Sequence, residues 1–597
     1  MTPRIEDYAL LGDLQTAALL SRDGRIDWLC LPRFDSPACF AALLHDPQAG
    51  MWELSSVDGH VTRRAYAGET LVVETEWAAS GGTVRVIDFM PPRGESADVV
   101  RIVEGVSGRV PMRMSLRIRF GYGRVTPWVH HQDDQVAAVA GPDALWLRTP
   151  VRVEGGDSES HAEFTVGPGD RVPFTLTYTP SHAPEPEPVN ADTALAETQK
   201  FWNDWIAQCQ YTGPWPDTVR RALVTLKALT YQPTGGILAA ATTSLPEQLG
   251  GSRNWDYRYC WLRDATFTLQ ALLGTGFTEE AHAWREWLVR AIAGDPAELQ
   301  TMYALDGGRY IPETSLDWLS GYEGSTPVRA GNDAAGQFQL DVWGEVLNGL
   351  HLARTAGLPA SQAAWERQRA LLDFLEGHWD RPDNGLWEVR GDRRHFVHSK
   401  VMAWTGVDRA IRMASRYHLD APLSQWRDLR DRIHKDVCDR GYDTERGTFT
   451  QFYGSRGVDA ALLLIPRTGF LPWTDPRFTG TLKAVRTHLE EDGFVRRYDP
   501  DADKDVDGLA GRQGSFIACS FWLADALHNT GQTAEARALF EKLLDLRNDV
   551  GLLSEEYDTH HKRQIGNTPQ GFSMVGLINT ARTLTGQPDV GTPPPEH

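Results

Sequence analysis

Glu388 is the first residue of this sequence whose setting suggests chemistry. It stands between Trp387 and Val389 in the stretch "DNGLWEVRG", residues 383–391. A carboxyl group flanked by apolar side chains has its charged form disfavoured, and the raised pKa that results suits a general acid near neutral pH. An exposed loop glutamate is the alternative, and this stretch alone does not decide between the two readings.

A second pair of acids, Glu555 and Glu556, lies in "GLLSEEYD", residues 551–558. Acidic residues just before a helix often complement the helix dipole. Here a turn at residues 566–570 separates the pair from the last predicted helix, so the dipole explanation is weak. The pair is therefore expected to line a cleft.

Arg263 and Asp264 are adjacent in "NWDYRYCWLRDATFTLQALL", residues 254–273, which is rich in aromatic residues. Asp264 could cap the helix that follows. A cap does not explain an arginine inside an aromatic cluster, where an unpaired charge is costly unless it meets a ligand or a partner. Since a guanidinium donates and a carboxylate accepts, the pair can bind neighbouring hydroxyl groups of a sugar. We interpret it as a ligand-binding pair.

Other groups of polar residues give weaker evidence for a functional site. "DADKDVDG", residues 501–508, begins like a calcium loop, but Gly514 stands where the bidentate glutamate belongs. His395 and His398 have no third metal ligand nearby in the sequence. No metal and no cofactor are predicted. Glu345, in "QLDVWGEVLNGL", is a rival to Glu388 as the acid, but it lies in a strong helical pattern.

The elements that must position these residues change character along the chain. Residues 5–178 show short apolar runs with period-two alternation, which predicts an antiparallel β-sandwich. A helical stretch follows between two proline-containing breaks. We expect a β-sandwich domain over 1–185, a linker helix within 186–215 and a helical domain over 216–597.

Twelve helices are predicted in the third part, with alternating long and short connections that fit six helical hairpins arranged as a toroid. A superhelical repeat array is the alternative, but the sequence has no fixed repeat period to support it. The helices are expected near residues 216–231, 264–275, 278–294, 336–356, 361–379, 398–417, 423–440, 457–464, 475–490, 514–531, 533–547 and 569–585.

The amino-acid composition restricts the kinds of molecule that the chain is expected to bind. The net charge of -20 disfavours nucleic acid, and no run of 18 apolar residues predicts a membrane span. The 21 Trp residues suit either a large core or a pocket that stacks on sugar rings. Scattered cysteines and an acidic N-terminal segment predict reduced thiols and a cytoplasmic protein. The cysteines are Cys30, Cys39, Cys209, Cys260, Cys438 and Cys519.

Several motifs together resemble bacterial members of glycoside hydrolase family 15, the glucoamylase, glucodextranase and trehalase family. They are "YALLGDLQTAALLSRDGRIDWLCLPRFDSPACF", "NWDYRYCWLRDA", "GLWEVRG", "HFVHSKVMAW", "GSFIACSFWLADAL" and "GLLSEEYD…GNTPQGFS". The resemblance spans the chain from Ile5 to the last helix. It implies an N-terminal β-sandwich, a linker and an (α/α)6 barrel.

The resemblance also implies an inverting mechanism without a cofactor, in which Glu388 is the general acid and Glu555 the general base. Glu556 is then a neighbouring pocket residue, and Arg263 and Asp264 hold the nonreducing-end glucose. Three more residues of these motifs are expected to bind substrate, namely Trp261, Trp387 and Lys400. This chain departs from related sequences at Gln513, where a glutamate often precedes the "GSF" segment, so its specificity could differ.

The activity expected is that of an inverting, exo-acting α-glucoside hydrolase acting on a small α-linked glucoside. A trehalase is favoured over a glucoamylase, an isomaltosidase or a glucodextranase-type enzyme, which would share the residues around the first glucose. A noncatalytic sugar-binding protein is the alternative of another class, and the presence of both Glu388 and Glu555 argues against it. The sequence does not predict the oligomeric state.

Overall fold

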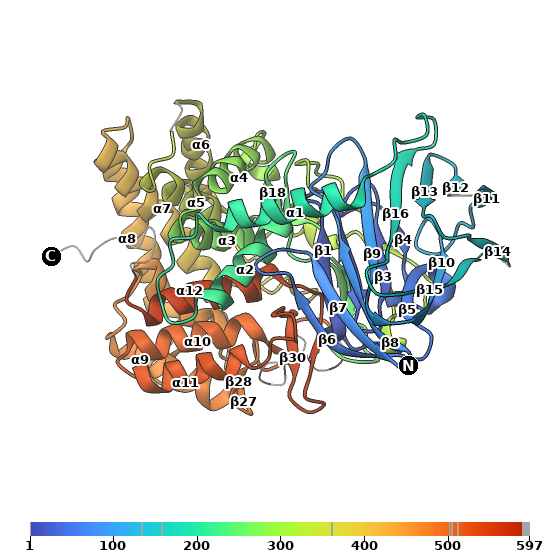
Figure 1. Cartoon of the computed structure of the whole chain (residues 1–597). Coiled ribbons are helices and arrows are strands. Elements are labelled where there is room, and N and C mark those ends of the chain that lie inside the picture. Colours follow the sequence, from blue (N-terminus) through green and yellow to red (C-terminus); the bar gives the residue numbers. More distant parts are fainter. Residues whose placement is uncertain are drawn as a thin grey trace.

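The structure is a computed structural model with two parts, one made of β-sheets and one of helices. It describes residues 2–132, 135–156, 159–359, 362–500, 502, 506–509, 511 and 513–587, and the side chain of residue 265 is not described. Figure 1 shows the sheets on one side of the molecule and the helices on the other, with helix α1 running across their junction. Half of the calcium-like segment at 501–508 lies outside the described residues.

The N-terminal part contains two antiparallel sheets, each with eight strands in the described residues. Most of their buried apolar side chains belong to one large hydrophobic core, while Ile87, Phe89, Val100 and Ile102 belong to a second, smaller cluster. The first sheet has the order β1-β2-β3-β5-β10-β15-β14, with β4 paired to β3, and the second has the order β11-β12-β13-β16-β9-β8-β7-β6. The bounds in the first sheet are β1 Tyr8–Gly12, β2 Ala17–Ser21, β3 Arg25–Cys30, β4 Ala38–Phe40, β5 Met51–Ser56, β10 Val110–Arg117, β14 Glu154–Gly156 and β15 Glu159–Val166. Those in the second are β6 His60–Tyr66, β7 Val73–Ala79, β8 Gly82–Phe89, β9 Ala97–Gly108, β11 Trp128–Gln132, β12 Gln135–Ala140, β13 Asp143–Arg148 and β16 Arg171–Pro180.

The period-two pattern of these strands has a direct physical reason. In β10, Val110, Met112, Met114 and Leu116 are buried, while the residues between them are partly or fully exposed. Successive side chains of a strand point to opposite faces, so this alternation buries one face against the core. The predicted antiparallel sandwich is confirmed.

The helical part follows α1 and closes into a ring. Helix α1 spans Ala191–Ile206, and the helices after it are α2 Pro216–Ala228, α3 Leu262–Gly274, α4 Thr278–Ala291, α5 Asp341–Thr355, α6 Gln362–His378, α7 Val397–Tyr417, α8 Leu423–Arg440, α9 Pro476–Leu489, α10 Ile517–Asn529, α11 Thr533–Leu544 and α12 Gly571–Leu584. Helix α3 packs on α5, α5 on α7, α10 on α12, and α12 back on α3. The short 3-10 helix η7, Ala460–Leu464, packs on both α7 and α10 and completes the inner ring.

The remaining helices pack outside this ring, and burial distinguishes the two layers. In the inner helix α7 every residue from Val397 to Ile411 is buried. In the outer helix α8 the buried residues are Trp426, Leu429, Ile433 and Val437, which lie on one face. The arrangement agrees with the predicted (α/α)6 barrel.

One predicted helix is wrong. Residues 457–464 were expected to form an α-helix, but only Ala460–Leu464 is helical, as the 3-10 helix η7. Pro466, two residues after Leu464, begins a second short 3-10 helix, and its ring and missing N–H prevent an α-helix from continuing through it. The other eleven predicted segments each contain an α-helix within the described residues.

The sandwich is bonded to the loops at one end of the barrel. The indole of Trp28 donates to the carbonyl of Ala241 at 2.9 Å, and the guanidinium of Arg258 donates to the carbonyl of Ser36 at 2.9 Å. These loops lead into the inner helices, so the sandwich supports that end of the barrel. No described helix combines the length and the apolar character that a membrane crossing requires.

Candidate active site

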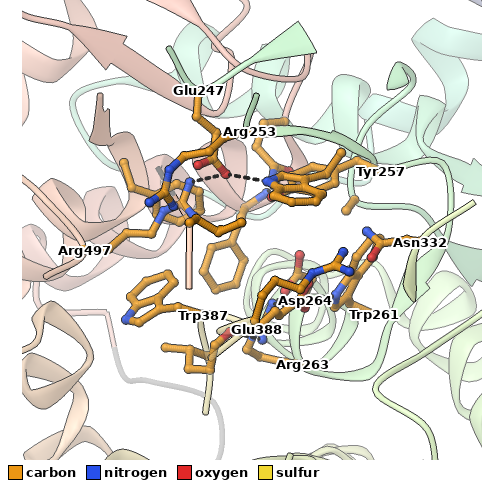
Figure 2. A pocket seen from close by; sticks show the side chains of 18 of the residues that line it. Glu247, Arg253, Tyr257, Trp261, Arg263, Asp264, Asn332, Trp387, Glu388 and Arg497 are labelled. Carbon is orange, nitrogen blue, oxygen red and sulfur yellow. Dashed lines mark hydrogen bonds and ion pairs between the residues drawn. The ribbon is translucent and has the colours of Figure 1, made fainter. Parts of the chain in front are cut away.

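A pocket opens at the end of the barrel where α3, α10 and α12 begin (Figure 2). It encloses about 700 Å³, including the space at its mouth. Its walls combine aromatic rings with several charged side chains, a composition that suits a polar ligand with flat faces. The lining residues are Ala239, Glu247, Arg253, Trp255, Tyr257, Trp261, Arg263, Asp264, Asn332, Leu386, Trp387, Glu388, Arg390, Arg497, Tyr498, Leu509, Phe516, Gln570 and Phe572.

Arg263 and Asp264 enter the pocket from the first turn of α3. The Nε of Arg263 donates to Oδ1 of Asp264 at 3.0 Å, and its Nη1 donates to the carbonyl of Leu386 at 2.8 Å. The N-cap position of α3 belongs to Trp261, so capping does not account for Asp264. Burial raises the pKa of Asp264, and Arg263 opposes that shift. The pair offers fixed donors and acceptors to hydroxyl groups in the pocket.

Glu388 lies beside this pair. Its Oε1 accepts a hydrogen bond from the indole of Trp261 and lies 3.8 Å from Nη2 of Arg263. Its backbone has a φ of 58°, in the left-handed region that non-glycine residues seldom adopt. Burial raises the pKa of Glu388, while Arg263 lowers it. A carboxyl group that keeps its proton to higher pH is suited to act as a general acid.

Trp387, next to Glu388, forms part of the apolar wall. Its indole N–H donates to both carboxylate oxygens of Asp459, at 2.9 and 3.0 Å. Its ring meets Phe516 edge-on at 5.6 Å between centroids and lies 6.0 Å from Trp522. These contacts therefore hold the ring in place where it lines the pocket.

Arg497 gathers three carboxylates on another side of the pocket. Its Nη2 donates to Oε1 of Glu247 at 2.9 Å, to Oε1 of Glu555 at 3.2 Å and also to Oε1 of Glu556. Figure 2 shows Glu247 and Arg497 on one side of the pocket and Arg263 on the other.

Glu555 is fully buried in this cluster, just before the short strand β30, Glu556–Asp558. The hydroxyl of Tyr257 donates to its Oε1 at 2.7 Å, and the backbone N–H of Asn567 donates to its Oε2 at 3.2 Å. Burial raises the pKa of Glu555 to about 7, the nearby charge of Glu247 adds to the increase, and Arg497 opposes it. A carboxylate with such a pKa can accept a proton near neutral pH.

The three carboxylates could also be considered as metal ligands. Oxygens of Glu247, Glu555 and Glu556 lie within 4.8 Å of one another. Each of them is bonded to Arg497, so the guanidinium already supplies positive charge at the centre of the cluster.

The structure brings most of the sequence-predicted residues to this pocket. Trp261, Arg263, Asp264, Trp387 and Glu388 line it. Glu555 and Glu556 are enclosed behind the wall, and both are bonded to Arg497, which lines it.

Lys400 is placed elsewhere. Its ammonium group is buried and donates to the carbonyl of Trp379 at 2.7 Å and to that of Arg381, and Lys400 is absent from the described lining of the pocket. His398, two residues earlier in α7, lines a second cavity, and two residues along an α-helix correspond to a rotation of about 200°, so Lys400 points away from that cavity. The expectation that Lys400 binds substrate is not supported by this position.

Glu345, the rival acid, lines a second cavity together with His398 and Arg409, between the inner helices. It follows Asp341 by one turn of α5 and is absent from the described lining of the first pocket. Gln513 reaches that pocket indirectly, since its amide donates to the hydroxyl of Tyr498 at 2.9 Å and Tyr498 lines the pocket.

Six charged or hydroxyl-bearing lining residues were missed by the sequence prediction: Glu247, Arg253, Tyr257, Arg390, Arg497 and Tyr498. Tyr257 stands inside the motif that contains Arg263, and proximity to that pair could have identified it. Glu247 lies in the loop "SLPEQLGG" and Arg497 in "FVRRYD", and neither stretch has a feature that distinguishes it from an ordinary surface loop.

Comparison with known proteins agrees with this site and fold. The family model described as glycosyl hydrolases family 15 matches residues 215–582, and one described as trehalase-like, N-terminal matches residues 1–200. A trehalase of Mycobacterium tuberculosis is 37% identical, over 97% of this chain and 89% of its own. A trehalase of Thermoplasma volcanium is 33% identical, over 98% of this chain and 94% of its own.

A solved bacterial glucoamylase complexed with acarbose has the same fold, with a TM-score of 0.71 at 12% identity, over 99% of this chain and 95% of that one. These matches extend over both the sandwich and the barrel, and they confirm the relationship that the motifs predicted. The chain belongs to glycosyl hydrolases family 15 and is a glycoside hydrolase.

Proposed function

We propose that this protein is an inverting trehalase, which hydrolyses α,α-trehalose to two molecules of glucose with Glu388 as general acid and Glu555 as general base. The observation that carries the proposal is the arrangement of the two carboxyl groups. Glu388 is held by Trp261 on one side of the pocket. Glu555 is held by Tyr257 and Arg497, which line another side.

The chemistry follows from this arrangement. Glu388 gives its proton to the glycosidic oxygen as the bond to the leaving glucose breaks. Glu555 takes a proton from a water molecule that attacks the anomeric carbon from the opposite face, as inversion requires. Burial raises the pKa of both groups, that of Glu555 to about 7, so Glu388 keeps its proton to higher pH than an exposed glutamate, and Glu555 can accept a proton once the pH exceeds about 7.

Substrate binding is assigned to the residues around Glu388. Arg263 and Asp264 hold the hydroxyl groups of the nonreducing-end glucose, and the rings of Trp261 and Trp387 pack on its apolar faces. Glu556 supports the site through Arg497. Trehalose is chosen over other α-glucosides because the relatives named above as trehalases match nearly the whole chain.

The proposal also includes the cellular location of the enzyme and its domain boundaries. Its six cysteines are free thiols, four of them buried, which suits the reducing cytoplasm. The domain boundaries proposed are 1–185 for the sandwich, 186–215 for the linker with α1, and 216–597 for the catalytic barrel.

Proton NMR of the first glucose released tests both substrate and mechanism. From trehalose, inversion yields one β-glucose from the attacked ring and one α-glucose from the leaving ring, so early spectra should show equal amounts of the two anomers. A retaining enzyme would release α-glucose from both rings, and early spectra with that anomer alone would refute the roles of Glu388 and Glu555. Glucose release from maltose or isomaltose, but not from trehalose, would refute the choice of substrate.

A further inference from the structure

Glu247 is a pocket carboxylate to which the proposed mechanism gives no part. It is 1% exposed, and its backbone is fixed by bonds from its N–H to the carbonyl of Arg253 at 3.0 Å and from the N–H of Gly514 to its carbonyl at 3.1 Å. Its Oε1 accepts hydrogen bonds from Arg497 at 2.9 Å and from the indole of Trp255 at 3.2 Å. Its Oε2 is buried and has no hydrogen-bond partner among the described residues.

The position of Glu247 couples it to the base. One guanidinium nitrogen, Nη2 of Arg497, serves Glu247, Glu555 and Glu556 at once. If all three carboxylates were ionised, three negative charges would share one positive charge in a buried site, which is unfavourable. The ionisation of Glu555 therefore depends on the carboxylates beside it.

Glu556 is less suited than Glu247 to influence the protonation of Glu555. Besides Arg497, it accepts a hydrogen bond from the backbone N–H of Gly514 at 2.8 Å, so both of its oxygens have partners. Glu247 lines the pocket and has an oxygen without a partner, whereas Glu556 is enclosed behind the wall.

We propose that Glu247 is a positioning residue that controls the protonation of Glu555 by holding a like charge beside it and competing with it for Arg497. This inference rests on the proposed function, in which Glu555 accepts the proton of the attacking water. The charged and titratable groups that act on Glu555 in the described structure are Glu247, Glu556, Arg497 and Tyr257.

The electrostatics of Glu555 support the inference. After burial, the charge of Glu247 is the largest influence that raises the pKa of Glu555, which reaches about 7, and Arg497 acts in the opposite direction. When the charge of Glu247 is removed, Glu555 keeps Arg497 with one competitor fewer. The pKa of Glu555 should then fall.

The variant Glu247→Gln tests this with little change of shape, because the amide keeps an oxygen that can accept from Arg497 and Trp255. We expect the acid limb of kcat/KM for trehalose, measured against pH, to move to lower pH by about 1–3 units, the range that a charge at this distance produces. An acid limb that stays in place, with kcat/KM reduced equally at every pH, would overturn the inference.

Glu280→Gln is the matched control. Glu280 is also buried and accepts hydrogen bonds at one oxygen from an indole and a cation, Trp205 at 2.6 Å and Lys227 at 2.9 Å, but it lies on α4 and outside the described lining of the pocket. Its substitution should lower the melting temperature and leave the pH profile where it is.

A second readout needs no substrate, so it separates failure of this inference from failure of the proposed function. Because the pKa of Glu555 is raised from 4.5 to about 7, its favourable contribution to stability is present below pH 4.5 and lost as the pH rises through 7. In Glu247→Gln the melting temperature should fall less over this range than in the wild type. An equal fall in both proteins would refute the inference, whereas an inactive wild type would refute only the proposed substrate.

Discussion

The placement of Glu388 depends on its own backbone. Its φ of 58° lies in a region that costs a non-glycine residue about 1–3 kcal/mol, so the surrounding structure must hold it there. The backbone N–H of Glu388 donates to Gly385 at 3.2 Å, and the side chain of Gln337 donates to the carbonyl of Glu388 at 3.1 Å. With the backbone fixed on both sides, the carboxyl group is directed at the indole of Trp261.

Substitution of either proposed catalytic carboxyl group should abolish most activity without unfolding the protein. Glu388→Gln cannot donate the proton and Glu555→Gln cannot accept one, and each group contributes about 10²–10⁴-fold to a rate. We expect kcat/KM for trehalose to fall by that factor in each variant. Near neutral pH, Glu555→Gln should melt no lower than the wild type, because the substitution removes one of the three carboxylates buried around Arg497. Activity close to wild type in either purified variant would remove that residue from its role.

At the scale of single residues, the sequence could predict those whose neighbours in the chain are unusual. Arg263 and Asp264 lie among aromatic residues in the sequence, Glu388 directly follows Trp387, and all three line the pocket. Glu247 and Arg497 are 250 positions apart, and their bond exists only because the barrel closes.

Among the elements, η7 has a special place because it completes the inner ring where an α-helix would be expected. Asp459 is its N-cap and accepts a hydrogen bond from the N–H of Ala461 at 2.8 Å. The same carboxylate accepts from the indole of Trp387, and burial raises the pKa of Asp459 to about 7. One side chain therefore fixes both the short helix and a wall of the pocket.

Asp459→Ala and Asp459→Asn should distinguish the effect of the two hydrogen bonds that Asp459 accepts, from η7 and from Trp387, from the effect of its negative charge. The alanine variant loses the cap and leaves the indole of Trp387 without its acceptor, so we expect a loss of about 1–3 kcal/mol in the free energy of unfolding. Its KM for trehalose should rise because the ring is no longer fixed. The asparagine variant keeps an acceptor oxygen and should retain a KM near wild type. A normal KM in Asp459→Ala, measured beside its denaturant unfolding curve, would show that Trp387 is held without Asp459.

Helices and strands were predictable where apolar residues recur on one face over many residues. The long helices α7 and α8 were expected at 398–417 and 423–440 and are found at Val397–Tyr417 and Leu423–Arg440. Two-residue strands such as β21, Cys260–Trp261, were not predicted, because so short a ladder has no period. Its pairing with β22, Met302–Tyr303, depends on how distant loops meet above the barrel.

For the whole molecule, Arg258 connects the sandwich to the active site. It is fully buried, and it donates across the interface to the carbonyl of Ser36 at 2.9 Å and to the hydroxyl of Tyr122 at 2.8 Å. Within its own loop it pairs with Asp256. Arg263 follows five residues later, so the chain that enters the pocket is fixed to the sandwich just before it does so.

Arg258→Met should therefore affect both stability and catalysis. It leaves the carboxylate of Asp256 buried without its cation, which costs about 3–5 kcal/mol. Because residues 259–264 lose their anchor, kcat/KM for trehalose should also fall, even at temperatures where calorimetry shows the variant fully folded.

Arg33→Met provides the control within the same interface. Arg33 pairs with Asp306 across the two domains and with Asp35 in its own loop, but the three side chains are 28%, 50% and 13% exposed, so each pair contributes about 0–1 kcal/mol. The Arg33→Met substitution should leave the kinetics unchanged and the melting temperature almost unchanged.

If Arg258→Met were destabilised but kept wild-type kcat/KM when folded, the sandwich would stabilise the barrel without positioning its active site. If Arg33→Met lost as much activity as Arg258→Met, any weakening of the interface would suffice, and the specific path through Arg258 to Arg263 would be refuted.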